Sequence, residues 1–495
     1  MRWADRFVIG FSIAAAVGVI APAAAIATVR PQALMTTSTV LTSSSASIVR
    51  DSRVTFTAQV SAVSGMPTGS VTFTDESNGS ILDTASLSNG TATFSTAALA
   101  PGSRSIVASY SGSSTFAAST SAAWGISVAR AGSLATAYQI DARHDGDQTS
   151  GTLSVGSLRR KWSVTLGETG GYRLAAVSYP VIAGGRVFVT VEYSQGYGSE
   201  LYALNAKTGA VDWSVDLGGS YDSSALTYDG RRVFALNYDG VLTAFAPGTG
   251  HELWSVQIPD QYAFEAPPTA YDGVVYVSGA GSGGTLYAVS EADGVVRWAR
   301  QVLGGDDGSP AVGDTGVYVS YDCQQDYRFS LRGHLVWNHF TACSGGGGST
   351  AVLHGSSLYA RGQNDLPIIL AKLSGAQTGS FSSVTAPAFG RGGMYTLQGG
   401  NLVAVDPSGS PNRWAFGDGS LVTAPVVSGG VVFVGSGDGT VYGVSARSGA
   451  QVWARTAGLM IFGPGEVSAG VKVGTAVGGG LLVIPAGNVL TAFGD

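Results

Sequence analysis

The chain has 495 residues, of which only 12% are charged, and its formal net charge is −6. This length exceeds one ordinary hydrophobic core and predicts two or more domains. Lysine and arginine form no stripe along the sequence, which argues against nucleic acid and anionic membrane surfaces as partners. The 72 glycines, with serine and threonine between short apolar runs, are typical of an all-β protein with many tight turns.

Residues 1–27 have the order of a secretory signal peptide. Two arginines precede an apolar stretch from Phe7 to Ile20, and mainly small residues follow. This order predicts export, with cleavage after Ala25 or Ala27. The alternative is an uncleaved anchor, because the stretch approaches the ~20 residues that span a bilayer. No cysteine lies near the cleavage region, which argues against a lipid anchor. We therefore expect a secreted, extracellular or envelope-associated protein, with no membrane span in the mature chain.

Residues 36–130 predict a β-sandwich. Apolar and polar residues alternate from Val54 to Val60 and from Ile106 to Tyr110, which marks strands with one buried and one solvated face. Several short strands in roughly 95 residues suit an immunoglobulin-like sandwich. The runs PTGSVTF from Pro67 and LAPGSRSIVASYSG from Leu99 resemble the bacterial immunoglobulin-like repeats of surface proteins. The resemblance implies a spacer or adhesive module.

Residues 159–495 repeat with a period of about 40 residues, after a linker or lead-in at 131–158. In most periods a turn glycine lies four residues before a tryptophan, as in LYALNAKTGAVDW and LYAVSEADGVVRW. This fixed offset indicates a hairpin whose register is set by a left-handed glycine. A second hairpin occurs once per period, so four strands in each of eight repeats predict an eight-bladed β-propeller.

The two ends of this segment predict how the ring closes. The strand around Trp162 has no strand pair of its own, and the last strand, Val489 to Phe493, has no tryptophan strand after it. Pairing these two strands completes the eighth blade and removes exposed sheet edges. The expected fold class is therefore all-β, an immunoglobulin-like β-sandwich followed by an eight-bladed β-propeller.

The motif D/N-x-x-T-G-x-x-x-W, matched best by Asn205, Thr208, Gly209 and Trp213, carries a family resemblance. It resembles the tryptophan-docking repeat of eight-bladed quinoprotein dehydrogenases and of non-enzymatic propellers such as the outer-membrane-assembly lipoprotein. Blade five departs from the motif, with Phe381 near the tryptophan position. The resemblance implies structural tryptophans that dock against neighbouring blades: Trp162, Trp213, Trp254, Trp298, Trp337, Trp414 and Trp453.

The two cysteines do not match the quinoprotein pattern. The resemblance implies, for an enzyme, a quinone under two adjacent cysteines with Ca²⁺ bound by Glu and Asn, whereas Cys323 and Cys343 are not adjacent. No C-x-x-C-H haem motif occurs either. We predict a disulfide between Cys323 and Cys343, because both follow strands that end on one propeller face and export supplies the oxidant. Two free thiols are the alternative.

The remaining polar residues give no catalytic or metal-binding set. The five histidines lack metal-ligand spacing and are expected at solvated turns, except that His144 is expected to pack at the domain junction. Acidic turns such as Asp306-Asp307-Gly308 have the composition of hairpin turns. We expect no cofactor and no metal ion.

These features predict an exported, non-catalytic binding or scaffold protein. It would be a monomer that binds a protein or glycan at the cell surface through one propeller face. The alternative is a quinoprotein dehydrogenase-like enzyme, intact or degenerate, that uses the central channel. A third interpretation is envelope assembly, as in the lipoprotein that the repeat resembles, but the missing lipid cysteine and the additional sandwich argue against it. Carboxylates and amides clustered at one channel mouth would favour the enzyme.

Overall fold

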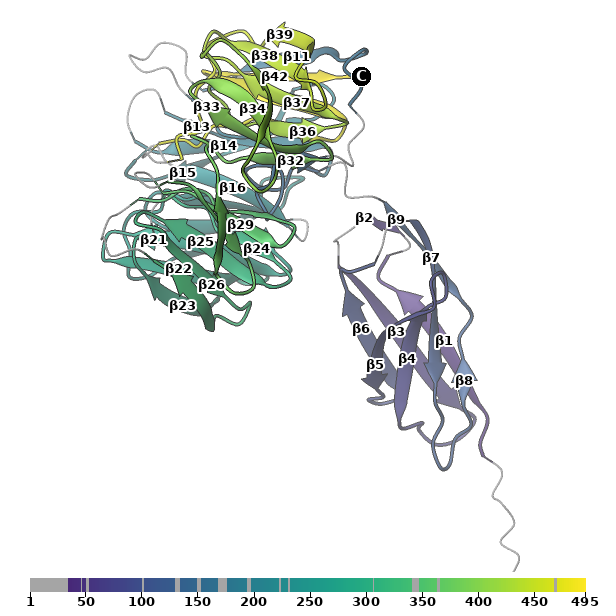
Figure 1. The fold of residues 1–495 in the computed structure, drawn as a ribbon. Coiled ribbons are helices and arrows are strands. Elements are labelled where there is room, and N and C mark those ends of the chain that lie inside the picture. Colours follow the sequence, from purple (N-terminus) through teal and green to yellow (C-terminus); the bar gives the residue numbers. More distant parts are fainter. Residues whose placement is uncertain are drawn as a thin grey trace, which may run out of the picture. The chain divides into compact units, whose positions relative to one another are not determined.

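The fold was analysed in a computed structural model (Figure 1). It describes residues 34–495 except 46, 50–52, 100–101, 130–133, 149–152, 168–175, 194–196, 222–223, 230–231, 306, 341–346, 363–365 and 467–469. The predicted signal peptide lies outside the described residues. No helix within the described ranges is long and apolar enough to cross a membrane.

The N-terminal unit is a two-sheet sandwich with the alternating burial that its sequence predicts. Its strands are β1 (Thr37–Ser43), β2 (Ser47–Val49), β3 (Val54–Ala62), β4 (Ser70–Asp75), β5 (Ser80–Ser86), β6 (Thr91–Thr96), β7 (Gly102–Tyr110), β8 (Ser119–Thr120) and β9 (Trp124–Ala129). One sheet has the order β1-β3-β6, and the other has the order β2-β9-β7-β4-β5 with β8 beside β7. Phe56 and Phe73 are fully buried between polar neighbours, and the Tyr110 hydroxyl donates to the Thr68 carbonyl at 2.6 Å.

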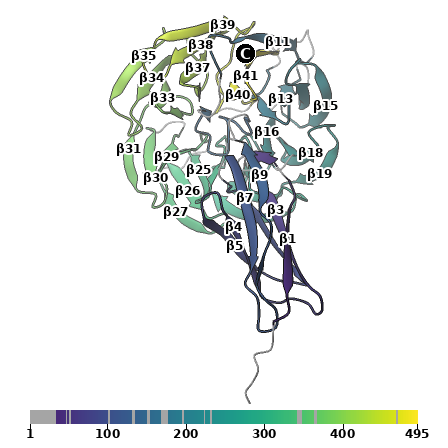
Figure 2. The same cartoon turned by 90° about the vertical axis from the view of Figure 1, so that its right-hand side faces the viewer.

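The C-terminal unit consists of eight sheets in its described residues, called blades 1 to 8 here, arranged in a ring (Figure 2). Blades 1 to 4 are β12 (Val181–Ala183), β13 (Arg186–Glu192), β14 (Ser199–Asn205), β15 (Val211–Gly218); β16 (Ser224–Asp229), β17 (Arg232–Asn237), β18 (Val241–Phe245), β19 (Glu252–Gln257); β20 (Thr269–Tyr271), β21 (Val274–Ala280), β22 (Gly284–Ser290), β23 (Val296–Val302); and β24 (Ala311–Gly313), β25 (Gly316–Tyr321), β26 (Gln325–Phe329), β27 (Leu335–His339). Blades 5 to 7 are β28 (Val352–His354), β29 (Ser357–Ala360), β30 (Ile368–Ala371), β31 (Gln377–Ser380); β32 (Ala388–Gly390), β33 (Gly393–Gln398), β34 (Asn401–Val405), β35 (Asn412–Phe416); and β36 (Val426–Ser428), β37 (Val431–Gly435), β38 (Thr440–Ser445), β39 (Gln451–Thr456). Strand β10 (Asp147–Gln148) pairs in parallel with β36.

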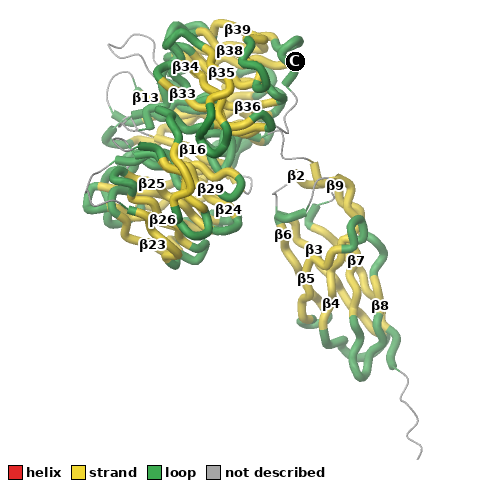
Figure 3. Tube along the Cα trace, in the orientation of Figure 1, coloured by secondary structure: helices red, strands yellow, loops and turns green. Residues whose placement is uncertain are grey.

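Within each of these seven blades the strands form an antiparallel meander, and no described residue is helical (Figure 3). The first strand of a blade lies innermost and is almost wholly buried, whereas the fourth strand is outermost and alternates between exposed and half-buried residues. Such alternation is typical of a sheet edge strand with one solvated face. Turns between first and second strands, and between third and fourth strands, therefore lie on one face of the ring.

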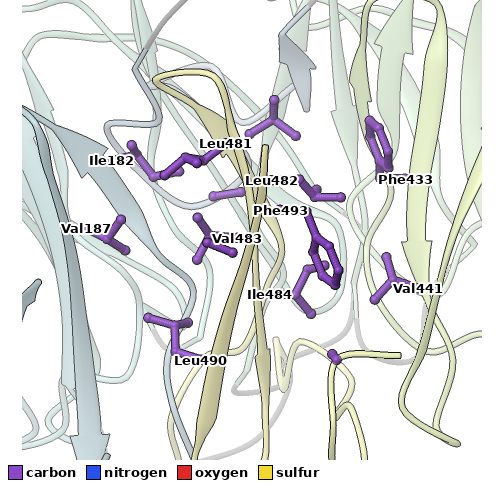
Figure 4. Packing of buried hydrophobic residues seen from close by; sticks show 14 of the residues in the cluster. Ile182, Val187, Phe433, Val441, Leu481, Leu482, Val483, Ile484, Leu490 and Phe493 are labelled. Atoms are coloured by element: carbon purple, nitrogen blue, oxygen red, sulfur yellow. The ribbon is translucent and has the colours of Figure 1, made fainter. Parts of the chain in front are cut away.

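Blade 8 is assembled from both ends of the propeller segment. It contains β40 (Ala476–Gly478), β41 (Leu481–Ala486) and β42 (Val489–Gly494), and β11 (Arg159–Thr165) is its outermost strand. Trp162 lies opposite Ala492 in the antiparallel pair of β11 and β42. Apolar residues of β41 and β42 pack between blade 1, through residues such as Ile182, and blade 7, through Phe433 (Figure 4). The closing blade is thus part of a continuous core.

Candidate functional site

The tryptophans connect neighbouring blades through their indole nitrogens. Trp254, on the outermost strand of blade 2, donates to the Glu291 carbonyl of blade 3 at 2.9 Å. An indole nitrogen can only donate, so each such bond satisfies a backbone carbonyl in the next blade. Five equivalent bonds of 2.9–3.4 Å run from Trp162 to Ala206, Trp213 to Pro247, Trp298 to Leu331, Trp337 to Lys372 and Trp453 to Leu158.

A left-handed glycine of the next blade lies against each of these rings except that of Trp453, whose next blade is blade 8. Gly294 has a φ of +73°, and a Cβ atom there would come within 2.8 Å of the Trp254 ring. The glycine is needed both for the positive φ and for the close approach. The sequence relates Gly294 to Trp298 of its own hairpin, yet the ring it touches belongs to the preceding blade. The same contact pairs Gly209 with Trp162, Gly250 with Trp213, Gly333 with Trp298, Gly375 with Trp337 and Gly449 with Trp414.

Blade 5 has no docking tryptophan. Gly379 lies opposite Ile369, at the register position where the other blades carry tryptophan, and Phe381 follows two residues later, just after β31. Phe381 is buried, and a Cβ atom on Gly409 of blade 6 would lie 3.3 Å from the Phe381 Cβ. The Phe381 ring packs edge-on against Tyr359 of its own blade, with centroids 5.6 Å apart. These contacts are part of the packing within and between blades.

The lead-in between the two domains lies inside the ring of inner strands. Residues 135–148 are hydrogen-bonded to inner strands of blades on all sides of the ring, and β10 is part of this segment. His144 is fully buried there. This corrects the expectation that His144 packs at the domain junction. Sequence reasoning missed this position because the segment has neither strand nor helix periodicity.

His144 forms hydrogen bonds through both ring nitrogens. Its Nδ1 atom donates to the Tyr138 carbonyl at 2.7 Å, and its Nε2 atom lies 3.1 Å from the Thr269 hydroxyl and 2.9 Å from the Pro310 carbonyl. Burial lowers the pKa of His144, and this effect outweighs the opposing effects of the two carbonyls and of nearby carboxylates. Nε2 also lies 3.2 Å from the Ser309 hydroxyl, so the histidine connects the lead-in to blade 3 and to the start of blade 4.

Two buried ion pairs lie beside the lead-in. Glu466 pairs with the Arg361 guanidinium and accepts from the Tyr138 hydroxyl at 2.5 Å. Burial, and then the negative charge of Glu466, raise the pKa of Tyr138 well above its usual value, so this phenol stays protonated. Lys472 lies 3.0 Å from the Asp307 carboxylate. Asp307 therefore does not lie in a hairpin turn, as its composition predicted, but in the loop between blades 3 and 4, where it is buried against a cation.

This arrangement does not fit the quinone and Ca²⁺ set of the alternative hypothesis. Glu466 and Asp307 each face a cation, and the lead-in side chain Tyr138 occupies the space beside Glu466. Among the described residues, no three His, Cys, Asp or Glu side chains are grouped as metal ligands. The charges therefore satisfy one another, as a buried pair must if it is not to destabilise the fold.

Cys323 follows β25 and is almost buried, with a φ of +64°. Cys343 lies outside the described residues. Cys323 is not a free thiol in the structure, which is consistent with the predicted disulfide, but that disulfide stays a prediction.

The face of the ring opposite the hairpin turns carries exposed apolar side chains. This interblade face consists of the loops between second and third strands and between successive blades. Tyr197, Tyr221 and Tyr238 form a cluster there, with ring centroids 5.7 Å and 4.5 Å apart. Other large apolar residues on this face with more than 40% exposure are Tyr262, Leu303, Phe340, Leu366, Val384, Leu459 and Met460.

Both parts of this architecture match known protein families. Three overlapping segments, 147–320, 240–414 and 330–492, match the family described as outer membrane protein assembly factor BamB. The chain belongs to this family. Residues 41–129 match the bacterial immunoglobulin-like domain of group 3.

Individual relatives agree with that assignment. BamB of Moranella endobia (strain PCIT) is 24% identical over 315 residues, which cover 60% of this chain and 71% of that protein. The crystal structure of BamB from Moraxella catarrhalis superposes with a TM-score of 0.52 at 15% identity over 68% of this chain and all of that one. Quinohemoprotein alcohol dehydrogenase from Comamonas testosteroni gives 0.58 at 14% identity over 73% and 80%. At such identities these two structures show the fold alone.

Proposed function

We propose that this chain is an exported, non-catalytic scaffold of the cell envelope that binds a protein partner through the interblade face. The observation that carries the proposal is the exposed tyrosine cluster. Tyr197 and Tyr221 are 68% and 52% exposed, and each contacts another tyrosine ring and not a buried core. Aromatic side chains are enriched at protein interfaces because they bury a large area at a small cost in conformational entropy.

The repeat itself does not explain these residues. Exposed apolar residues such as Leu253 and Val336 recur directly before docking tryptophans on outermost strands, so they follow from the repeated hairpin. The exposed residues of the interblade face lie in loops that differ from blade to blade, and loops on a rigid scaffold are where binding residues concentrate. The matched family and the matched relative are also named as assembly factors. The sandwich serves as a spacer between the propeller and the attachment point.

The test compares two variants of the mature chain as affinity baits on envelope extracts of the native cell. Tyr197→Ser with Tyr221→Ser alters the interblade face, and Val295→Ser, at 58% exposure in the hairpin turn between β22 and β23 on the opposite face, is the control. We expect one protein to be retained by wild type and control and lost with the double variant, at unchanged melting temperature. Equal retention by all three would refute the proposal. A ligand that survives proteolysis of the extract and is destroyed by periodate would identify a glycan instead.

A further inference from the structure

The lead-in contacts seven blades at one equivalent position. This position is the residue directly before the last one of each inner strand. The blade 1 residue Ile182 exchanges two backbone bonds with Ala135, of 3.0 and 2.7 Å. The amides of Tyr228, Val312, Leu353, Phe389 and Val427 donate to the carbonyls of Thr136, Ala142, Arg143, Asp145 and Gly146 at 2.7–2.9 Å, and Gln148 Nε2 donates to the Val477 carbonyl at 3.0 Å. Blade 3 is reached through the His144 side chain.

These bonds make the ring a template for the lead-in backbone. Ile140 has a φ of +84° and His144 a φ of +57°, which are unfavourable for residues with a Cβ atom and persist only where surrounding structure holds them. Gly146 has a φ of +60°, and a Cβ atom there would lie 2.7 Å from the Ala388 Cβ. A free linker would not keep this conformation, so the ring supplies the energy that holds it.

We propose that the inner ring is a peptide-binding site whose ligand is the chain's own segment 134–148. The non-covalent contacts of this segment are sufficient to keep the sandwich attached to the propeller after the chain is cut at 149–152. The site takes a peptide that is folded through tight turns at 138–139 and 142–143, with a small residue at Gly146, a buried histidine and a terminal glutamine.

The chain order gives this site a mechanical role. The sandwich precedes the lead-in, and the lead-in precedes β11, whose pairing with β42 closes the ring. Tension on the sandwich therefore reaches the lead-in before the closing strand. The lead-in bonds from Ala135 to Gln148 all precede β11 in the chain, so they must break before the closing strand bears the tension. The lead-in protects the closure from being peeled open. This inference does not depend on the proposed partner.

The test uses the full mature chain with a protease site replacing residues 149–152. After folding and cleavage, the sandwich with the lead-in attached should co-elute with the propeller in gel filtration. The matched control carries the site at 131–133, so that cleavage leaves the lead-in with the propeller, and here the sandwich should elute separately. Separation in the first protein would overturn the proposal. Co-elution in the control would also overturn it, because the lead-in would then not be what retains the sandwich.

Two variants of the first protein grade the interaction. Gly146→Ala should release the cleaved sandwich at least ~10-fold faster, the rate change that ~1.4 kcal/mol produces. Gln148→Ala removes only side-chain hydrogen bonds, to the Leu134 and Val477 carbonyls. Because it does not strain the backbone, it can be measured even if Gly146→Ala fails to fold. It should also speed release. Release at the wild-type rate by Gln148→Ala would show that these contacts do not hold the lead-in.

Discussion

The contact between turn glycine and docking tryptophan can be isolated within a single blade. Gly294 and Gly273 both lie in hairpin turns of blade 3 with similar φ values, +73° and +81°. A Cβ atom at Gly294 would meet the Trp254 ring at 2.8 Å, whereas nothing lies within 4 Å of one at Gly273. The substitutions Gly294→Ala and Gly273→Ala therefore share the backbone cost and differ in the contact.

The expected magnitudes follow from this difference. A left-handed alanine costs about 1–2 kcal/mol, and the reduced entropy of the unfolded chain offsets about 0.4–1 kcal/mol of it. Gly273→Ala should thus lower the free energy of unfolding by about 1 kcal/mol. Gly294→Ala adds overpacking of about 1–3 kcal/mol, because the bond from Trp254 to Glu291 keeps the ring from moving away. The total loss should be about 2–4 kcal/mol.

Urea unfolding followed by far-ultraviolet circular dichroism measures both variants against wild type. The decisive quantity is the difference between the two free energies of unfolding, since the backbone cost cancels in it. Equal losses in Gly294→Ala and Gly273→Ala would refute the docking argument. A larger loss in Gly273→Ala would do so as well.

Three other perturbations test the same structure. Trp254→Phe should lower the free energy of unfolding by about 1–3 kcal/mol, because the Glu291 carbonyl loses its donor. When Trp254→Phe is combined with Gly294→Ala, the total loss should be smaller than the sum of the two single losses, because both changes affect the same contact. His144 has a lowered pKa in the folded state, so its stabilisation is complete above about pH 6.5 and is lost as pH falls below that value. The melting temperature of His144→Gln should then depend less on pH between 8 and 5 than that of wild type, and parallel curves would contradict this. Lys472→Met should lower the free energy of unfolding by about 3–5 kcal/mol, because it leaves the Asp307 charge buried and unpaired. Adding Asp307→Asn should reverse most of the accompanying decrease in melting temperature.

Local sequence signals were sufficient for the sheets. The offset between Gly209 and Trp213 sets the register of one hairpin, and its repetition at a constant period indicates sheets that must pack on their neighbours. Period-two alternation from Val54 to Val60 likewise appears as alternating burial along β3. The closing pair of β11 and β42 follows from the same logic, since an incomplete repeat at each end of the segment implies one shared blade.

The interior of the ring was not accessible to such reasoning. Asp307 and Lys472 are 165 positions apart in sequence, and Arg361 and Glu466 are 105 apart, so no spacing rule relates them. An aspartate next to a glycine looks like a turn residue whether or not a lysine covers it. The lead-in shows no periodicity because its bonds are made by backbone groups, which every sequence possesses.

The lead-in also explains how the inner edge of the ring is satisfied without a ligand. Each inner strand pairs with the second strand on one side only, so its other edge presents backbone groups toward the axis. Buried backbone groups without partners are costly, and water or another polar group must satisfy them. In this chain the amides of Val312 and Leu353, among others, are satisfied by the lead-in. The inner edge of the ring is therefore completed in this chain by the polypeptide itself.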